Sequence, residues 1–126
     1  MPLAQELPDF RYVPRGVDAE GRVTLNERCF SASFLVSAEV LVEHWRPRRV
    51  AELVPEDLEP AFALAPSVLL LGTGTRHAFP APAVLAAALT RGIGLEAMDN
   101  AAAARTFAVL AGEGRRVVAA FLIDAG

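Results

Sequence analysis

Lysine is absent from this sequence, so all 12 basic residues are arginine. A P-loop nucleotide site needs a lysine beside the phosphates, and its absence excludes that site. The chain also has a single cysteine, Cys29, which excludes an internal disulfide and a thiolate metal cluster within one chain. Because Cys29 lies in a strand-like segment, we expect it to be a small buried hydrophobic residue.

Long apolar runs and an excess of positive charge are missing as well. No run reaches the roughly 20 apolar residues that a membrane-spanning helix needs, and the first residues lack the basic region of a signal peptide. We therefore expect no transmembrane segment and a cytoplasmic location. The formal net charge is −3, which argues against nucleic acid as a partner. The densest basic patch, residues 46–49, is expected to be a solvated strand end.

Apolar residues dominate what is present. Of the 126 residues, 53% are hydrophobic and 21% are charged, which is typical of a globular chain with one domain over residues 1–126. We divide this domain into a β-rich amino-terminal layer, residues 1–46, and an αβαβαβ core, residues 55–123.

The core is organised around four apolar residues, 68–71, that lead directly into Gly72, Thr73 and Gly74. An unbroken apolar run indicates a strand that is buried on both faces. In open α/β sheets, ligands usually bind beyond the carboxyl ends of such strands. The loop 72–80 is therefore the first place to look for a site.

Local signals continue the pattern after this strand. A helix, a strand, a third helix and a second buried strand are predicted in turn over residues 82–92, 93–98, 101–111 and 117–123. Gly92 supplies a left-handed cap to the first of these helices, and Asp99 or Asn100 caps the next one. The resulting βαβαβ unit predicts a mainly parallel α/β sheet, which is mixed if the last strand pairs antiparallel.

The amino-terminal half predicts an antiparallel β layer. Alternating apolar residues and turn signals indicate short strands over residues 10–13, 22–25, 29–36 and 40–45. The last two are separated by only three residues, which favours a hairpin. Trp45 at its end is expected to anchor the core and to find a partner for its indole N–H. A helix is then predicted between Pro55 and Pro66.

Comparison with known catalytic and cofactor motifs leaves each of them incomplete. The dinucleotide fingerprint needs a third glycine at position 77, where this chain has His77, and two prolines delay the following helix. Asp99 does stand at about the right distance for a ribose hydroxyl. There is no G-x-S-x-G elbow, and His44 and His77 lie far apart without carboxylates at metal-ligand spacing. We therefore assign no catalytic residue, no metal ligand and no cofactor, and the balance favours a protein that is not an enzyme.

A polar cluster remains at the predicted carboxyl edge of the sheet. Its members come from two loops and the third helix, and they are Gly72, Thr73, Gly74, Thr75, Arg76, His77, Asp99, Asn100, Arg105 and Thr106. In one interpretation Asp99 and Asn100 only cap a helix and Arg76 is solvated. In the other, the cluster forms a pocket for a small anion or polar metabolite, with Arg76 and Arg105 as charge partners.

Four sequence blocks resemble a known family. They are Leu-Leu-Gly-Thr-Gly at 70–74, Gly-Ile-Gly-Leu-Glu-Ala-Met-Asp at 92–99, Ala-Ala-Arg-Thr-Phe at 103–107 and Glu-Gly-Arg-Arg-Val at 113–117. The sequence is similar to the DUF498-type family of small stand-alone proteins of unknown function, and its bacterial branch is the closer match. This family includes the mitochondrial respiratory complex I assembly factor 3 and an adipogenesis-associated protein.

The resemblance carries expectations about fold and function. It implies a three-layer α/β domain with a β layer beside a central mixed sheet, and no established enzyme activity or cofactor. It also implies action through protein–protein contacts during assembly. Our first hypothesis is therefore a non-catalytic interaction or assembly module with a protein partner. It predicts an exposed apolar or mixed patch near the Gly72 loop or the amino-terminal β arm, and no closed pocket. The alternative is a small-anion binder that uses residues 72–77 with Asp99 and Arg105, which predicts a concave pocket with converging polar groups.

Overall fold

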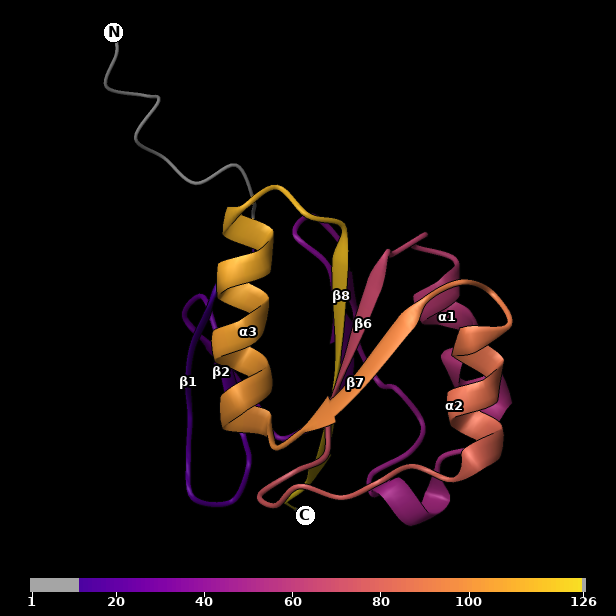
Figure 1. Cartoon of the computed structure of the whole chain (residues 1–126). Coiled ribbons are helices and arrows are strands. Elements are labelled where there is room, and N and C mark those ends of the chain that lie inside the picture. The colour runs from indigo at the N-terminus through magenta and orange to yellow at the C-terminus, as the bar shows by residue number, and fades with distance from the viewer. Residues whose placement is uncertain (1–11, 126) are drawn as a thin grey trace, which may run out of the picture.

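Two β-sheets organise the protein, for which a computed structural model describes residues 12–125. The smaller sheet is antiparallel and has the order β1-β2-β3, whereas the larger has the order β5-β4-β8-β6-β7. The strands are β1 Pro14–Val17, β2 Val23–Leu25, β3 Arg28–Phe30, β4 Ala32–Val36, β5 Leu41–Val42, β6 Val68–Gly72, β7 Gly94–Met98 and β8 Val117–Asp124 (Figure 1). The helices are α1 Glu59–Phe62, α2 Pro82–Leu89 and α3 Asn100–Gly112, preceded by the 3-10 turns η2 Val50–Glu52 and η3 Pro55–Leu58.

The larger sheet is mixed because strands from both halves of the chain join it. Strand β6 pairs in parallel with β7 on one side and with β8 on the other, so the predicted βαβαβ unit is parallel and its strand order, which the sequence left open, is β7-β6-β8. Strand β8 also pairs with β4, and that pairing is antiparallel. The last strand is therefore parallel to its partner in the βαβαβ unit, and the amino-terminal half supplies the antiparallel part.

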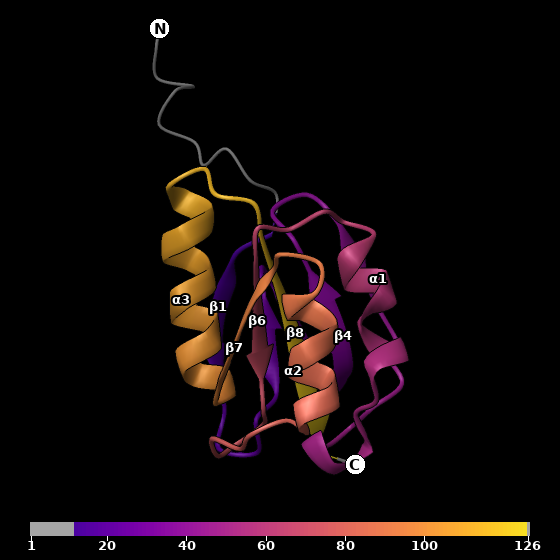
Figure 2. The same cartoon turned by 45° about the vertical axis from the view of Figure 1, so that its right-hand side comes forward.

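Both faces of the larger sheet are covered (Figure 2). On one face, α3 and the smaller sheet pack with Val117, Ala119, Phe121 and Ile123 of β8. On the other face, α1 and α2 pack with Val118, Ala120 and Leu122. Because alternate residues of a strand point to opposite faces, this double cover explains why β8 is an unbroken apolar run.

The expected amino-terminal layer is divided between the two sheets. The strand predicted over residues 29–36 breaks at Ser31, so that β3 ends one sheet and β4 enters the other. Strand β4 lies inside the larger sheet, between β5 and β8, and its residues Phe34 and Leu35 face opposite sides and are both fully buried. Half of the strand expected at residues 10–13 lies outside the described residues, and β1 starts later, at Pro14.

Two further expectations need correction. Cys29 is exposed, because the alternation of β3 turns Phe30 into the core and leaves its neighbour outside. The helix predicted over residues 55–66 is shorter and consists of η3 followed by α1. Pro60 cannot donate the backbone hydrogen bond to the Glu56 carbonyl that a continuous α-helix from Pro55 would contain, and its ring disfavours such a helix. Among the described residues, no helix is long and apolar enough to cross a membrane.

Candidate functional site

The loops that follow β6 and β7 are neighbours, as the sequence predicts. The Thr73 amide donates a hydrogen bond of 2.8 Å to the Met98 carbonyl, and the Thr73 hydroxyl lies 2.5 Å from the Arg76 carbonyl oxygen. The backbone amide of Asn100 donates a hydrogen bond of 2.8 Å to the Gly74 carbonyl. These bonds join the loops that leave β6 and β7. Beside them, between the carboxyl ends of β6 and β8, lies the crevice at which ligands bind in many open α/β sheets.

Asn100 fills that crevice with its own side chain. It is fully buried, and its Oδ1 accepts a hydrogen bond from the Gly74 amide at 3.1 Å. Its Nδ2 donates to the carbonyl oxygens of Gly21 and Leu122, both at 2.9 Å. One amide group therefore connects the β1–β2 turn, the Gly72 loop, the start of α3 and the end of β8.

Gly72 owes its identity to this contact. A Cβ atom at position 72 would lie 2.3 Å from the Asn100 Oδ1 and 3.0 Å from the Phe121 Cδ1. Gly74 has a backbone φ of 99°, which residues with a side chain rarely adopt. The Gly-Thr-Gly turn thus serves the closure of the crevice by Asn100.

Asp99 caps α3, and Asn100 does not. The Asp99 carboxylate accepts a hydrogen bond of 2.8 Å from the Ala102 amide, which satisfies one of the free donors at the helix start. Thr106, about two turns further along, lies with its hydroxyl 3.5 Å from the Met98 sulfur. Both side chains therefore have local partners within α3 and β7.

The remaining predicted site residues lie apart from one another. Arg76 lines a depression of about 360 Å³ at the carboxyl edge of the larger sheet, together with residues 73–75. Exposed Arg105 lines a different depression, between α3 and β1. His77 is exposed, and its ring meets the Phe79 ring edge-on at 4.5 Å. The expected pairing of Arg76 with Arg105 at one pocket is therefore absent from the described structure.

Two other arginines, which the sequence predicts to belong to a solvated strand end, lie in the same depression as Arg76. Arg48 and Arg49 line the same depression and share the Asp124 carboxylate at the end of β8, at 2.9 Å and 3.6 Å. The sequence marks residues 46–49 as its densest basic patch, but no local signal says that this patch lies against the loop after β6.

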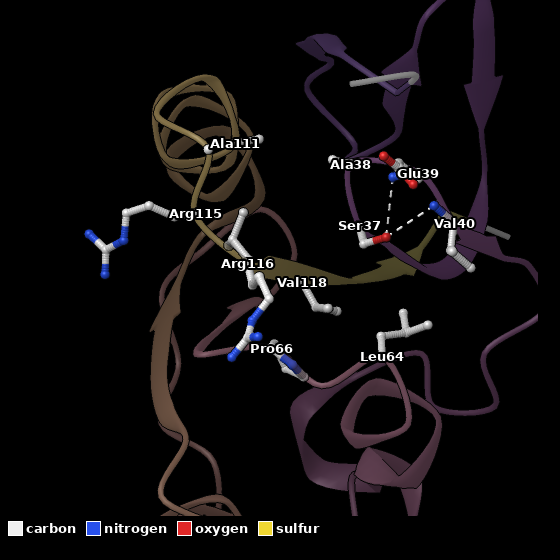
Figure 3. A pocket seen from close by; sticks show the side chains of 12 residues that line it. Ser37, Ala38, Glu39, Val40, Leu64, Pro66, Ala111, Arg115, Arg116 and Val118 are labelled. Carbon is white, nitrogen blue, oxygen red and sulfur yellow. Dashed lines mark hydrogen bonds between the residues drawn. The ribbon is translucent and has the colours of Figure 1, made fainter. Parts of the chain in front are cut away.

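A third depression, of about 380 Å³, lies at the opposite end of the larger sheet (Figure 3). The tip of the β4–β5 hairpin, the segment before β6 and the start of β8 surround it. Its Ser37 hydroxyl accepts hydrogen bonds from the amides of Glu39 and Val40, and the Arg115 side chain extends away from the other lining residues.

The described residues also contain no group of three or more histidines, cysteines or carboxylates that could hold a metal ion.

The most exposed apolar surface belongs to α2 and the loop before it. Every residue of α2 is apolar, and Leu85 and Leu89 are 40% and 76% exposed. Phe79, in the loop that leads into α2, is 79% exposed.

These features define a small mixed α/β domain in which the usual ligand crevice is closed from within. The sequence matches the model of a protein family of unknown function, DUF498/DUF598, over residues 18–122. The chain belongs to this family, and the resemblance predicted from the four sequence blocks is confirmed.

Solved structures agree with this assignment. The NMR structure of the Xanthomonas campestris protein XCC1710 has a TM-score of 0.84 and 50% sequence identity, covering 99% of this chain and 94% of that one. A crystal structure of a Bordetella parapertussis protein has a TM-score of 0.83 and 38% identity, covering 90% and 96% of the two chains. The solution NMR structure of a Bordetella pertussis protein, described as a Mth938-like domain, has a TM-score of 0.80 and 31% identity, covering 98% and 93%. A comparison with curated proteins found no match.

Proposed function

We propose that this domain is a non-catalytic interaction or assembly module whose contact surface is the outer side of α2. The observation that carries the proposal is the composition of this helix, which has no polar residue between Pro82 and Leu89. A helix that is apolar all round is normally covered on all sides. In the single chain only one side of α2 is covered, so a partner would complete its burial.

The spacing of the exposed residues supports a continuous contact surface. Val84 and Ala88 are fully buried and face the larger sheet. The exposed residues Pro82, Leu85, Ala86 and Leu89 recur at intervals of three and four, which puts them on one side of the helix. Phe79 extends the apolar character into the loop after Gly72, where the interaction hypothesis expects an exposed patch.

The surroundings of α2 indicate what kind of partner fits. Arg91 pairs with Glu59 at 3.0 Å near the carboxyl end of the helix, and Glu56 lines the same shallow depression. An apolar centre with a charged border is the usual composition of a protein interface. We propose a protein partner, in the cytoplasm, that presents aliphatic or aromatic side chains to Leu85 and Leu89.

A photo-crosslinking amino acid at position 89 tests this proposal in living cells of the source organism. We expect one discrete crosslinked species, because a specific partner occupies the surface in a single orientation. The matched control places the same amino acid at Val109, an equally aliphatic residue of α3 that is 58% exposed. Position 109 should give no such species.

A second variant separates specific contact from adhesion. Leu85→Glu, introduced together with the crosslinker at position 89, should abolish the crosslinked species, whereas Val109→Glu should leave it. The Leu85→Glu variant should keep its thermal midpoint within a few degrees, because the side chain is on the surface. No crosslink at position 89, or the same pattern at positions 89 and 109, would overturn the proposal, and a species of twice the chain mass would identify the partner as a second copy.

A further inference from the structure

We infer that the depression beside Arg76 is a binding site for a phosphate group. Three arginines line it, and they come from segments that lie far apart in the sequence: Arg48 and Arg49 precede η2, and Arg76 follows β6. This surface is separate from the outer side of α2, so the inference goes beyond the proposed function and can fail independently of it.

The guanidinium groups are held in place yet keep free donors. Arg48 contacts Asp124 through one nitrogen, and Arg49 contacts Asp124 at 3.6 Å and Glu52 at 3.2 Å. Each guanidinium has five N–H donors, so most of them are left for water or a ligand. Their side chains are 56% and 64% exposed, so a ligand in the depression can reach them.

Arg76 is the member whose guanidinium has no protein partner. It is exposed, and its side chain forms no ion pair or hydrogen bond with any described residue, while its backbone carbonyl accepts the Thr73 hydroxyl. In the part of the chain that the structure describes, the amides of Thr75 and Arg76 donate no hydrogen bond either. A planar, permanently charged guanidinium beside free backbone donors suits the tetrahedral oxygens of a phosphate.

Two carboxylates also line the depression, and both have cationic partners. Asp124 lies between Arg48 and Arg49, and Glu20 lies 3.3 Å from Arg22, which also pairs with Asp18. The lining side chains therefore carry three positive and two negative charges. The Glu52 carboxylate beside Arg49 offsets the third positive charge, so the unpaired guanidinium of Arg76, and not a net charge of the lining, is what favours an anion. The volume of about 360 Å³ leaves space for a small organic group on the phosphate.

The test is a titration of the purified chain with inorganic phosphate at constant ionic strength, followed by amide chemical shifts in NMR spectra. We expect saturable shifts at Gly74, Thr75 and Arg76, with a dissociation constant on the order of 1 mM or tighter. Arg76→Ala should weaken binding about tenfold, since it removes a charge-assisted contact. Because Arg76 has no ion pair to lose, this variant should keep a folded spectrum.

Three control arms make the result specific. Arg105→Ala removes an exposed arginine at the depression between α3 and β1 and should leave the affinity for phosphate unchanged. Glu20→Gln removes a negative charge from the lining and should tighten binding, which a purely structural role for Glu20 would not do. Leu89→Glu should leave phosphate binding unchanged, so that failure of the interaction proposal is told apart from failure of this one.

The ligand class is decided by comparing anions. Tighter binding of glycerol 3-phosphate than of inorganic phosphate assigns the site to a phosphate monoester, and the reverse order assigns it to free phosphate. Acetate that binds as tightly as phosphate would overturn the inference. Absence of saturation up to about fifty times the expected dissociation constant, or equal weakening by Arg105→Ala, would also overturn it.

Discussion

At the scale of single residues, Asn100 and Gly72 depend on each other. The asparagine amide makes three side-chain hydrogen bonds in a fully buried position, and one of its atoms occupies the space that a side chain at position 72 would need. Buried polar groups are stable only when their hydrogen bonds are satisfied, so this arrangement tolerates little change on either side.

Gly72→Ala should therefore lower the free energy of unfolding by roughly 2–3 kcal/mol, measured by urea denaturation, because the added methyl group displaces a buried amide. The control is Gly94→Ala in β7, where an added Cβ meets no atom within 4 Å. That variant should change the stability by about 0.5 kcal/mol or less.

The same pair gives a double-mutant test. Asn100→Ala alone should be destabilising by about 2–4 kcal/mol because it leaves buried partners unsatisfied. Adding Gly72→Ala to it should have a much smaller further effect, since the clashing oxygen is gone. Full additivity of the two changes would contradict the proposed contact.

At the scale of elements, Asp57 links the turn η3 by hydrogen bonds to Trp45 and Arg46, in the segment that follows β5. Its backbone carbonyl accepts a hydrogen bond of 2.8 Å from the Trp45 indole N–H. The sequence predicted that this indole would have a hydrogen-bond partner. Its carboxylate accepts hydrogen bonds from Arg46 at 2.9 Å and 2.6 Å and from the Val54 amide at 2.9 Å. Partial burial raises the pKa of Asp57, but these hydrogen bonds outweigh it and hold the pKa below its ordinary value.

This depressed pKa has a defined consequence for acid stability. The unfolded chain binds a proton at Asp57 near pH 4, whereas the folded chain does so only at lower pH. The stabilisation by Asp57 is thus complete above about pH 5 and is lost as the pH falls through the folded-state pKa. Asp57→Asn should lower the free energy of unfolding by about 1–2 kcal/mol at pH 7, and the difference from the natural chain should shrink below about pH 4 in urea titrations.

Glu43 provides the control for this measurement. The hydrogen bond from Arg28 also lowers the pKa of Glu43, but this pair is on the surface. Glu43→Gln should leave the stability nearly unchanged at all pH values, because exposed ion pairs contribute little. A constant difference between the natural chain and Asp57→Asn down to pH 2 would contradict the assignment.

At the scale of the whole molecule, β8 is the common element of the two cores. It pairs on both edges, and seven of its eight residues are buried, from Val117 to Ile123. Strand β5, by contrast, pairs on one edge only and has partly exposed residues.

Native-state hydrogen exchange should reflect this difference. The amides of β8 should exchange only through global unfolding, with a protection that follows the total stability in denaturant. The amides of Leu41 and Val42 should exchange faster and nearly independently of denaturant, because the edge strand opens locally. Equal protection of the two strands would contradict this picture.

The elements from β6 to β8 were predictable from the sequence, because their signals are local. Apolar runs, the proline before α2, the left-handed Gly92 and the Asp99 cap each act within a few residues of their own position. The carboxyl edge could also be located, since the strands ending there are parallel.

What only the tertiary structure decided concerns contacts between segments far apart in the chain. The segment after Ser31 joins the larger sheet because it pairs with β8, some ninety residues later in the chain. The hydrogen bond from the Ile123 amide to the Ser33 hydroxyl is part of this contact. The role of Asn100 depends on Gly21 and Leu122, and the position of Arg48 beside Arg76 depends on Asp124. Such contacts are favourable only when several distant segments are packed together, so no short stretch of sequence encodes them.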